Sequence, residues 1–183
     1  MSKFFAGKYK NLEAYVPGEQ PRDMKYIKLN TNESPFPPSP SVIAALNGEE
    51  AAKLCLYSDP TSKALKQAIA KQYGFDSKNV FVSNGSDEIL NFAFMLYGEE
   101  KGTLFPDISY GFYKVFGDLY RIDYTEIPLK EDFSIDVNDY IGKDKFIVIA
   151  NPNAPTGMTI TLEDIEKIVS SNSESVVLID EAY

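Results

Sequence analysis

The chain has 183 residues, of which 44% are hydrophobic and 25% are charged, as in ordinary globular proteins with a sizeable core. The formal net charge of −9 argues against a general nucleic-acid-binding or anionic-membrane-binding protein, and no apolar run approaches the length of about 18 residues that indicates a membrane span. The absence of histidine excludes Ser-His nucleophile activation and histidine-based metal sites, and no metal site is expected. The single cysteine, Cys55, cannot form an internal disulfide, so a reducing cytoplasm is the expected location.

The first thirty residues show no clean hydrophobic period and are predicted to form an N-terminal arm, in which residues 26–29 have the composition of a short strand. Residues 30–40 contain four prolines, and each proline fixes its own φ and biases the preceding residue away from helix. This stretch is therefore either a stiff linker or a rigid loop that offers Asn and Glu side chains at a cleft.

Two helices are predicted in the next part of the chain. Ser39 caps and Pro40 opens a short helix that ends near Leu46. The second helix begins after Pro60, carries an apolar stripe and ends at Gly74.

A strand over residues 80–83, a turn and a helix over residues 89–97 follow. Gly85 permits a tight backbone turn, and the first free amides of the helix fall on Ser86 and Asp87. Such a helix start suits an anion, because its donors point outward and the helix dipole favours negative charge. The same residues are also ordinary turn and cap residues.

Strand and helix then alternate to the end of the chain. Strands are predicted over residues 103–105, 122–127, 145–150 and 176–180, a long helix ends near Tyr120, a short helix covers residues 136–142, and a helix capped by Thr161 and Asp164 covers residues 162–170. The alternation predicts an α/β fold with a mostly parallel, doubly wound sheet. The carboxyl ends of its strands are expected to gather Gly85, Tyr110, Asn153 and Asp180 around one cleft.

The last predicted strand is followed at once by Asp180, Glu181 and Tyr183. An aspartate at the end of a buried strand is poorly solvated and needs a cationic partner. A pyridinium nitrogen would serve, and Tyr183 would be close enough to reach the phenolic oxygen of the same ring. The alternative is a strand end whose acidic side chains face solvent.

Taken together, six motifs in this order resemble the fold-type I pyridoxal-phosphate aminotransferases, and among them most closely the histidinol-phosphate aminotransferases. The motifs are LNTNESPFPPSP (29–40), YSDP (57–60), VSNGSDE (82–88), ISYGFY (108–113), NPNAPTG (151–157) and DEAY (180–183). The resemblance implies that residues 1–30 are an N-terminal arm and that residues 31–183 are the N-terminal portion of the large domain that binds the cofactor.

The resemblance also implies a cofactor, pyridoxal 5′-phosphate, and residues that hold it. Ser86 and Asp87 would donate backbone amides to its phosphate, and Tyr110 would stack on its pyridine ring. Asp180 would pair with the protonated ring nitrogen, which keeps the ring an electron sink. Tyr183 would donate a hydrogen bond to the phenolic oxygen.

Further positions follow from the same resemblance. Tyr57 would reach across a dimer interface to the phosphate of the other subunit, and Tyr15 and Asn32 match positions that line the substrate pocket. The family often has N-N-P-T-G, in which the Asn before the proline holds the phenolic oxygen. Ala154 occupies that position here, and Asn153 is the nearest candidate for the role.

In this family the lysine that binds the cofactor covalently lies downstream of the Asp-x-x-Tyr strand, and no lysine follows Lys167. The chain is therefore expected to be the N-terminal part of the enzyme, inactive by itself, without the rest of the large domain and without the small domain. The parent protein would be a cytoplasmic homodimer that moves an amino group between histidinol phosphate and 2-oxoglutarate, a step of histidine biosynthesis.

Two alternatives stay open at this point. The first is a pyridoxal-phosphate-dependent decarboxylase of a phosphorylated amino acid, which would share every motif quoted. The second is a non-catalytic α/β module that binds a phosphorylated ligand at Ser86 and Asp87.

Overall fold

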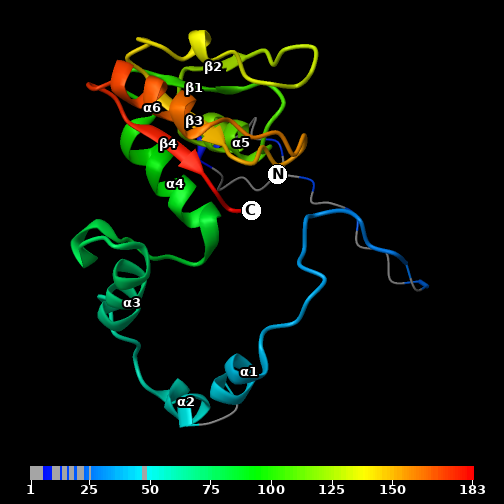
Figure 1. The fold of residues 1–183 in the computed structure, drawn as a ribbon, viewed down its shortest axis with the longest axis vertical. Coiled ribbons are helices and arrows are strands. Elements are labelled where there is room, and N and C mark those ends of the chain that lie inside the picture. The colour runs from blue at the N-terminus through cyan, green and yellow to red at the C-terminus, as the bar shows by residue number, and fades with distance from the viewer. Residues whose placement is uncertain are drawn as a thin grey trace. The chain divides into compact units, whose positions relative to one another are not determined.

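The computed structural model describes residues 6–9, 13, 16, 19, 23–24, 26–46 and 49–183 (Figure 1). The chain divides into two compact units, one that contains residues 83–183 and one that contains residues 14–82, and each is described by itself. The predicted boundary at residue 30 and the assignment of residues 31–183 to one large domain stay predictions. No helix in the described ranges is long and apolar enough to cross a membrane.

The unit of residues 83–183 contains a four-stranded parallel sheet with the strand order β2-β1-β3-β4. Its strands are β1 (Thr103–Pro106), β2 (Tyr124–Ile127), β3 (Phe146–Ala150) and β4 (Val177–Asp180), and its α-helices are α4 (Gly85–Tyr97), α5 (Phe112–Tyr120) and α6 (Leu162–Ser171). The predicted α/β class and the mostly parallel sheet are confirmed.

Two hydrophobic clusters cover opposite faces of this sheet. One joins α4 and α5 to Phe105, Phe146 and Val148, and the other joins α6 to Ile147 and Ile149. Because successive side chains of β3 point to opposite faces, a strand covered on both faces must be apolar throughout, and all five residues of β3 are buried.

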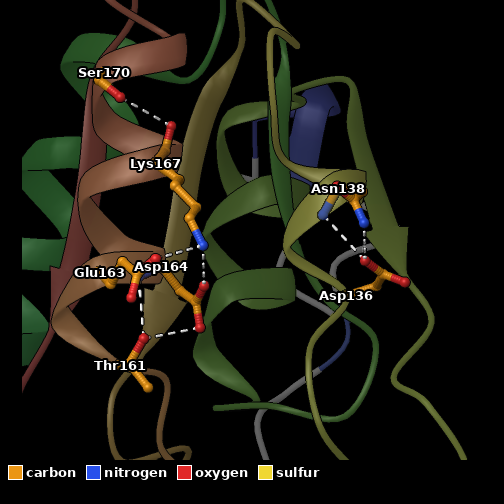
Figure 2. A network of polar contacts seen from close by, with 7 residues as sticks. All are labelled: Asp136, Asn138, Thr161, Glu163, Asp164, Lys167 and Ser170. Atoms are coloured by element: carbon orange, nitrogen blue, oxygen red, sulfur yellow. Dashed lines mark hydrogen bonds and ion pairs between the residues drawn. The ribbon is translucent and has the colours of Figure 1, made fainter.

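The start of α6 shows how local sequence fixes a helix boundary (Figure 2). The Thr161 hydroxyl accepts a hydrogen bond from the Asp164 amide at 3.1 Å and donates one to Asp164 Oδ2 at 2.9 Å, which confirms the predicted cap. Lys167 Nζ lies 3.1 Å from Glu163 Oε1 and 3.3 Å from Asp164 Oδ1. The Thr161 hydroxyl, and then Lys167, hold the pKa of Asp164 below its ordinary value.

The predicted short helix over residues 136–142 is shorter than expected. A single 3-10 turn, η4 (Val137–Asp139), occupies this stretch. Asp136 Oδ1 accepts hydrogen bonds from the backbone amide of Asn138 at 3.1 Å and from its side-chain amide at 3.0 Å (Figure 2). These local bonds stabilise one tight turn, and no further helical turn follows.

The predicted strand over residues 80–83 is wrong. Val80 has an extended backbone, but residues 80–83 join no ladder in the part of the chain that the structure describes. Helix α4 begins at Gly85, four residues before the predicted start. The Glu88 carboxylate folds back to accept hydrogen bonds from the Asn84 amide at 3.1 Å and from the Ser83 hydroxyl, which holds the end of this segment against the start of α4. Residues 26–29 form no strand either.

The unit of residues 14–82 is helical where it is regular. It contains α1 (Pro40–Leu46), α2 (Glu49–Ala52) and α3 (Lys63–Tyr73) with the 3-10 turns η2 (Lys53–Cys55) and η3 (Ser77–Asn79); a further 3-10 turn, η1 (Gly7–Tyr9), precedes it. The two predicted helices are confirmed as α1 and α3. Gly74 ends α3 with a φ of 75°, a left-handed conformation that favours glycine.

Candidate functional site

A pocket lies where β3 and β4 end, beside the first turn of α4. Its lining comes from four segments of the unit of residues 83–183: Asn84, Gly85, Ser86, Asp87, Tyr110, Ala150, Pro152, Ala154, Asp180, Ala182 and Tyr183. This is the edge at which open α/β sheets place their ligands, because the carboxyl ends of parallel strands meet there.

The first turn of α4 contributes backbone donors to this pocket. The N-cap residue Asn84 makes no side-chain cap hydrogen bond, and the first amides of a helix have no partner within the helix. Gly85 has a φ of 77°, and a Cβ there would meet no atom within 4 Å, so conformation and not crowding favours glycine. The amides of Ser86 and Asp87 are thus available to an anion, which the helix dipole also favours.

Tyr110 contributes an aromatic ring whose orientation is fixed. Its hydroxyl donates a hydrogen bond to Asp87 Oδ1 at 2.8 Å, which links the ring to the start of α4. The ring stacks on Phe112 with a centroid distance of 5.5 Å and meets Tyr113 edge to face at 5.7 Å. A flat ligand in the pocket would therefore meet an aromatic side chain that is already held in place.

Asp180 contributes a half-buried carboxylate at the end of β4. Oδ2 accepts a hydrogen bond from the Tyr113 hydroxyl at 2.8 Å, and Oδ1 accepts one from the Ala182 amide at 3.3 Å. The Asp180 carbonyl accepts from the Asn151 amide at 2.9 Å, which fixes the backbone against the end of β3. No cation pairs with Asp180 within the described residues, so the carboxylate is free to bind a positively charged group of a ligand.

The loop after β3 is held by Asn153, whose side chain is only 4% exposed. Nδ2 donates to the Ile108 carbonyl at 2.9 Å and to Thr156 Oγ1 at 3.1 Å, and Oδ1 accepts from the Ser109 hydroxyl at 2.9 Å. Asn153 does not line the pocket, and its neighbours Pro152 and Ala154 do. Its side chain joins the loop of β3 to the segment that carries Tyr110.

The predicted site residues fall into three groups. Ser86, Asp87, Tyr110, Asp180 and Tyr183 come together in the pocket, whereas Asn153 lies outside its lining. The other unit contains Asn32 and Tyr57, whose side chains are exposed, and Tyr15 lies outside the described residues. The cofactor and substrate roles of all these residues stay predictions.

Two residues that contact the segments of this site, Tyr113 and Glu88, were not predicted from the sequence. Tyr113, which sequence analysis does not separate from an ordinary core residue, donates to Asp180 from 67 positions away. Glu88 folds back onto the segment before α4, where the Ser83 hydroxyl and then the Asn84 amide lower the pKa of its carboxyl. The chemical indication for Tyr113 was its hydroxyl, since a buried tyrosine hydroxyl usually has a hydrogen-bond partner.

The amino-acid sequence of the chain is similar to those of known proteins. The family model described as aminotransferase class I and II matches residues 24–183. A curated relative, histidinol-phosphate aminotransferase of Clostridium acetobutylicum, is 54% identical over 100% of the chain. The alignment covers 52% of that relative, so the chain spans about half the length of the curated relatives it matches.

Solved structures share the fold at lower identity. Histidinol-phosphate aminotransferase from Sinorhizobium meliloti in complex with pyridoxal-5′-phosphate gives a TM-score of 0.75 at 22% identity, over 82% of this chain and 42% of that chain. L-threonine-O-3-phosphate decarboxylase from Porphyromonas gingivalis gives 0.60 at 22% identity, over 74% and 40%. These likenesses concern the fold alone.

The hydrogen bonds of Asn153 predict a stability defect. Asn153→Ala in the complete protein would leave the Ile108 carbonyl and the Ser109 hydroxyl without these partners. We expect the free energy of unfolding, measured in urea, to fall by about 2–3 kcal/mol. The control Asn138→Ala removes an exposed side chain whose one hydrogen bond within the described residues goes to Asp136, and it should cost less than about 0.5 kcal/mol. Equal stability of the two variants would contradict a structural role for Asn153.

Proposed function

Since the chain belongs to the class I and II aminotransferase family, we propose that it forms part of a histidinol-phosphate aminotransferase that uses pyridoxal phosphate. One observation carries this proposal: a single pocket brings together the free amides at the start of α4, the ring of Tyr110 and the carboxylate of Asp180. The identity of the Clostridium acetobutylicum relative supports histidinol phosphate as the amino donor. We propose 2-oxoglutarate as the acceptor.

The pocket fits pyridoxal phosphate at both of its charged ends. The amides of Ser86 and Asp87 would hold the phosphate, which is anionic, and Asp180 would hold the ring nitrogen, which is cationic when protonated. Tyr110 would cover the ring between them, and Tyr183 at the rim would donate to the phenolic oxygen. The cofactor, when bound, supplies an electron sink for negative charge at the substrate's α-carbon.

The protein's contribution at this site is to hold a proton and to exclude water. Asp180 would accept a hydrogen bond from the ring nitrogen and would favour its protonated form, because an adjacent opposite charge favours the charged state of a group. Tyr110, which is held by Asp87 and Phe112, would limit the motion of the cofactor ring and keep water from its face. Asn153 acts indirectly, since it holds the loop that carries Pro152 and Ala154.

We also propose that the complete protein is a cytoplasmic homodimer in which residues 31–183 belong to the large domain. The unit of residues 14–82 supports an interface: α1 buries none of its side chains, Phe36 is 80% exposed and Leu54 is 85% exposed. Large exposed apolar side chains in one region indicate an interaction surface. Tyr57 lies in the same unit with its side chain completely exposed, so it is available to a second subunit.

The two alternative functions, a decarboxylase and a non-catalytic binding module, have less support than an aminotransferase. A decarboxylase of this fold would use the same cofactor pocket. The similarity to the decarboxylase structure from Porphyromonas gingivalis, at 22% identity, supports the fold alone. A non-catalytic module that binds a phosphorylated ligand needs the amides of Ser86 and Asp87 but gives no role to the Asp180 carboxylate, which has no cation beside it among the described residues.

The proposed interface predicts that Tyr57→Phe weakens cofactor binding. Loss of one hydrogen bond to a charged phosphate should raise the dissociation constant for pyridoxal phosphate by about tenfold. The control Tyr73→Phe removes the hydroxyl of another exposed tyrosine of the same unit and should have no effect. Sedimentation of the complete protein should show a dimer; a monomer, or unchanged affinity in Tyr57→Phe, would count against the interface.

The proposed pairing of Asp180 with the ring nitrogen predicts a large loss of activity in Asp180→Asn. The amide keeps the shape of the side chain but removes the charge that holds the proton, a loss of about 3–4 kcal/mol. We expect the transamination rate to fall by about 10²- to 10³-fold while the protein keeps its fold and retains the cofactor after desalting. Glu181→Gln, which changes an exposed acid outside the pocket lining, should leave the rate unchanged. Near-normal turnover of Asp180→Asn would remove this carboxylate from the reaction.

A further inference from the structure

The buried side chain of Tyr113 lies directly behind the carboxylate of Asp180. It is 0% exposed and belongs to the cluster that joins α4 and α5 to the sheet. Its ring packs against Phe94 at 6.2 Å, Phe105 at 5.7 Å and Tyr110 at 5.7 Å. These three aromatic contacts restrict the orientation of the Tyr113 ring and therefore the direction of its hydroxyl.

That hydroxyl donates a hydrogen bond to Asp180 Oδ2 at 2.8 Å. Asp180 lines the pocket and Tyr113 does not, so the carboxylate lies between the core and the pocket. Across the described ranges, Tyr113 is the only side chain that donates to Asp180, and the second donor is the Ala182 amide. A carboxylate oxygen has two acceptor sites, so each oxygen keeps one for a ligand.

Tyr113 is suited to hold this carboxylate without taking its charge. Burial, and then the neighbouring charge of Asp180, raise the pKa of the Tyr113 hydroxyl far above its ordinary value. The hydroxyl therefore stays protonated and remains a donor throughout the pH range in which an enzyme works. A neutral donor restricts the rotation of the carboxylate and leaves its negative charge available to a cation.

We propose that Tyr113 is a positioning residue that holds the Asp180 carboxylate in the orientation needed to accept the protonated nitrogen of the cofactor ring. The proposal rests on the proposed function, because it requires that nitrogen to lie at Asp180. Without the hydroxyl, the Asp180 side chain would keep one of its two hydrogen bonds and could rotate about its side-chain torsions. The ion pair with the ring would then be longer and weaker.

The test measures the pKa of the ring nitrogen in the complete protein, loaded with pyridoxal phosphate labelled with 15N at that atom. Its chemical shift, followed by NMR against pH, reports the proton directly. Tyr113→Phe keeps the ring and removes only the hydroxyl, and should lower this pKa by roughly one unit because the looser carboxylate holds the proton less well. An unchanged or raised pKa overturns the proposal.

Tyr120→Phe is the matched control. Tyr120 lies on the same helix, its hydroxyl donates to Asn91 Oδ1 at 2.7 Å, and it does not line the pocket. Its removal should leave the ring-nitrogen pKa unchanged. An equal shift in both variants would mean that loss of any tyrosine hydroxyl of α5 disturbs the site, which also overturns the proposal.

Wild-type protein and Asp180→Asn in the same titration separate this inference from the proposed function. A wild-type ring nitrogen that carries no proton, or one that Asp180→Asn does not affect, contradicts the placement of the cofactor. A shift in Asp180→Asn with none in Tyr113→Phe contradicts only the role of Tyr113.

A second measurement applies if Tyr113→Phe does not fold. The hydroxyl proton of Tyr113 is followed by NMR in the wild-type protein as either pyridoxal phosphate or its 1-deaza analogue, in which carbon replaces the ring nitrogen, is bound. If Asp180 is shared between Tyr113 and the ring nitrogen, the two ligands shift this proton by different amounts. Equal shifts overturn the proposal.

Discussion

The parallel pairing of β3 with β4 is the constraint on which the pocket depends. The register sets Ala150 beside Asp180, and the bond from the Asn151 amide to the Asp180 carbonyl continues the ladder into the following loop. β3 can occupy the middle of the sheet because helices cover both of its faces. The Asp180 carboxylate at the end of β4 is therefore placed by pairing with the buried strand β3, and the packing of the core determines its position.

In a chain of net charge −9, the pocket has one end that favours an anion and one end that favours a cation. The start of α4 attracts negative charge, and Asp180 attracts positive charge. Two acids at the start of α4 accept hydrogen bonds from the protein: Asp87 accepts from Tyr110, and Glu88 accepts from Ser83 and Asn84. A ligand with an anionic group at one end and a cationic ring at the other suits both ends of the pocket, which is the charge pattern of pyridoxal phosphate with a protonated ring.

The sequence predicted those features that depend on residues close together in the chain, such as the positions of strands and of the first turn of α4. Apolar runs located β1, β3 and β4, and the turn at Gly85 located the free amides of Ser86 and Asp87. Residues 80–83 have the composition of a strand, but a strand also needs a partner, which composition does not reveal. The direction in which Asn153 points, into the protein and away from the pocket, and the bond between Tyr113 and Asp180 depend on contacts between distant segments. Neither the direction of the Asn153 side chain nor the Tyr113–Asp180 hydrogen bond could therefore be predicted from the sequence.

We propose that the start of α4 and Asp180 bind the two ends of one cofactor. A crystal structure of the complete protein with pyridoxal phosphate tests it most directly. We expect phosphate oxygens on the amides of Ser86 and Asp87, and the ring nitrogen within about 2.7–3.2 Å of an Asp180 carboxylate oxygen. A phosphate bound elsewhere, or a ring nitrogen that faces away from Asp180, would contradict it.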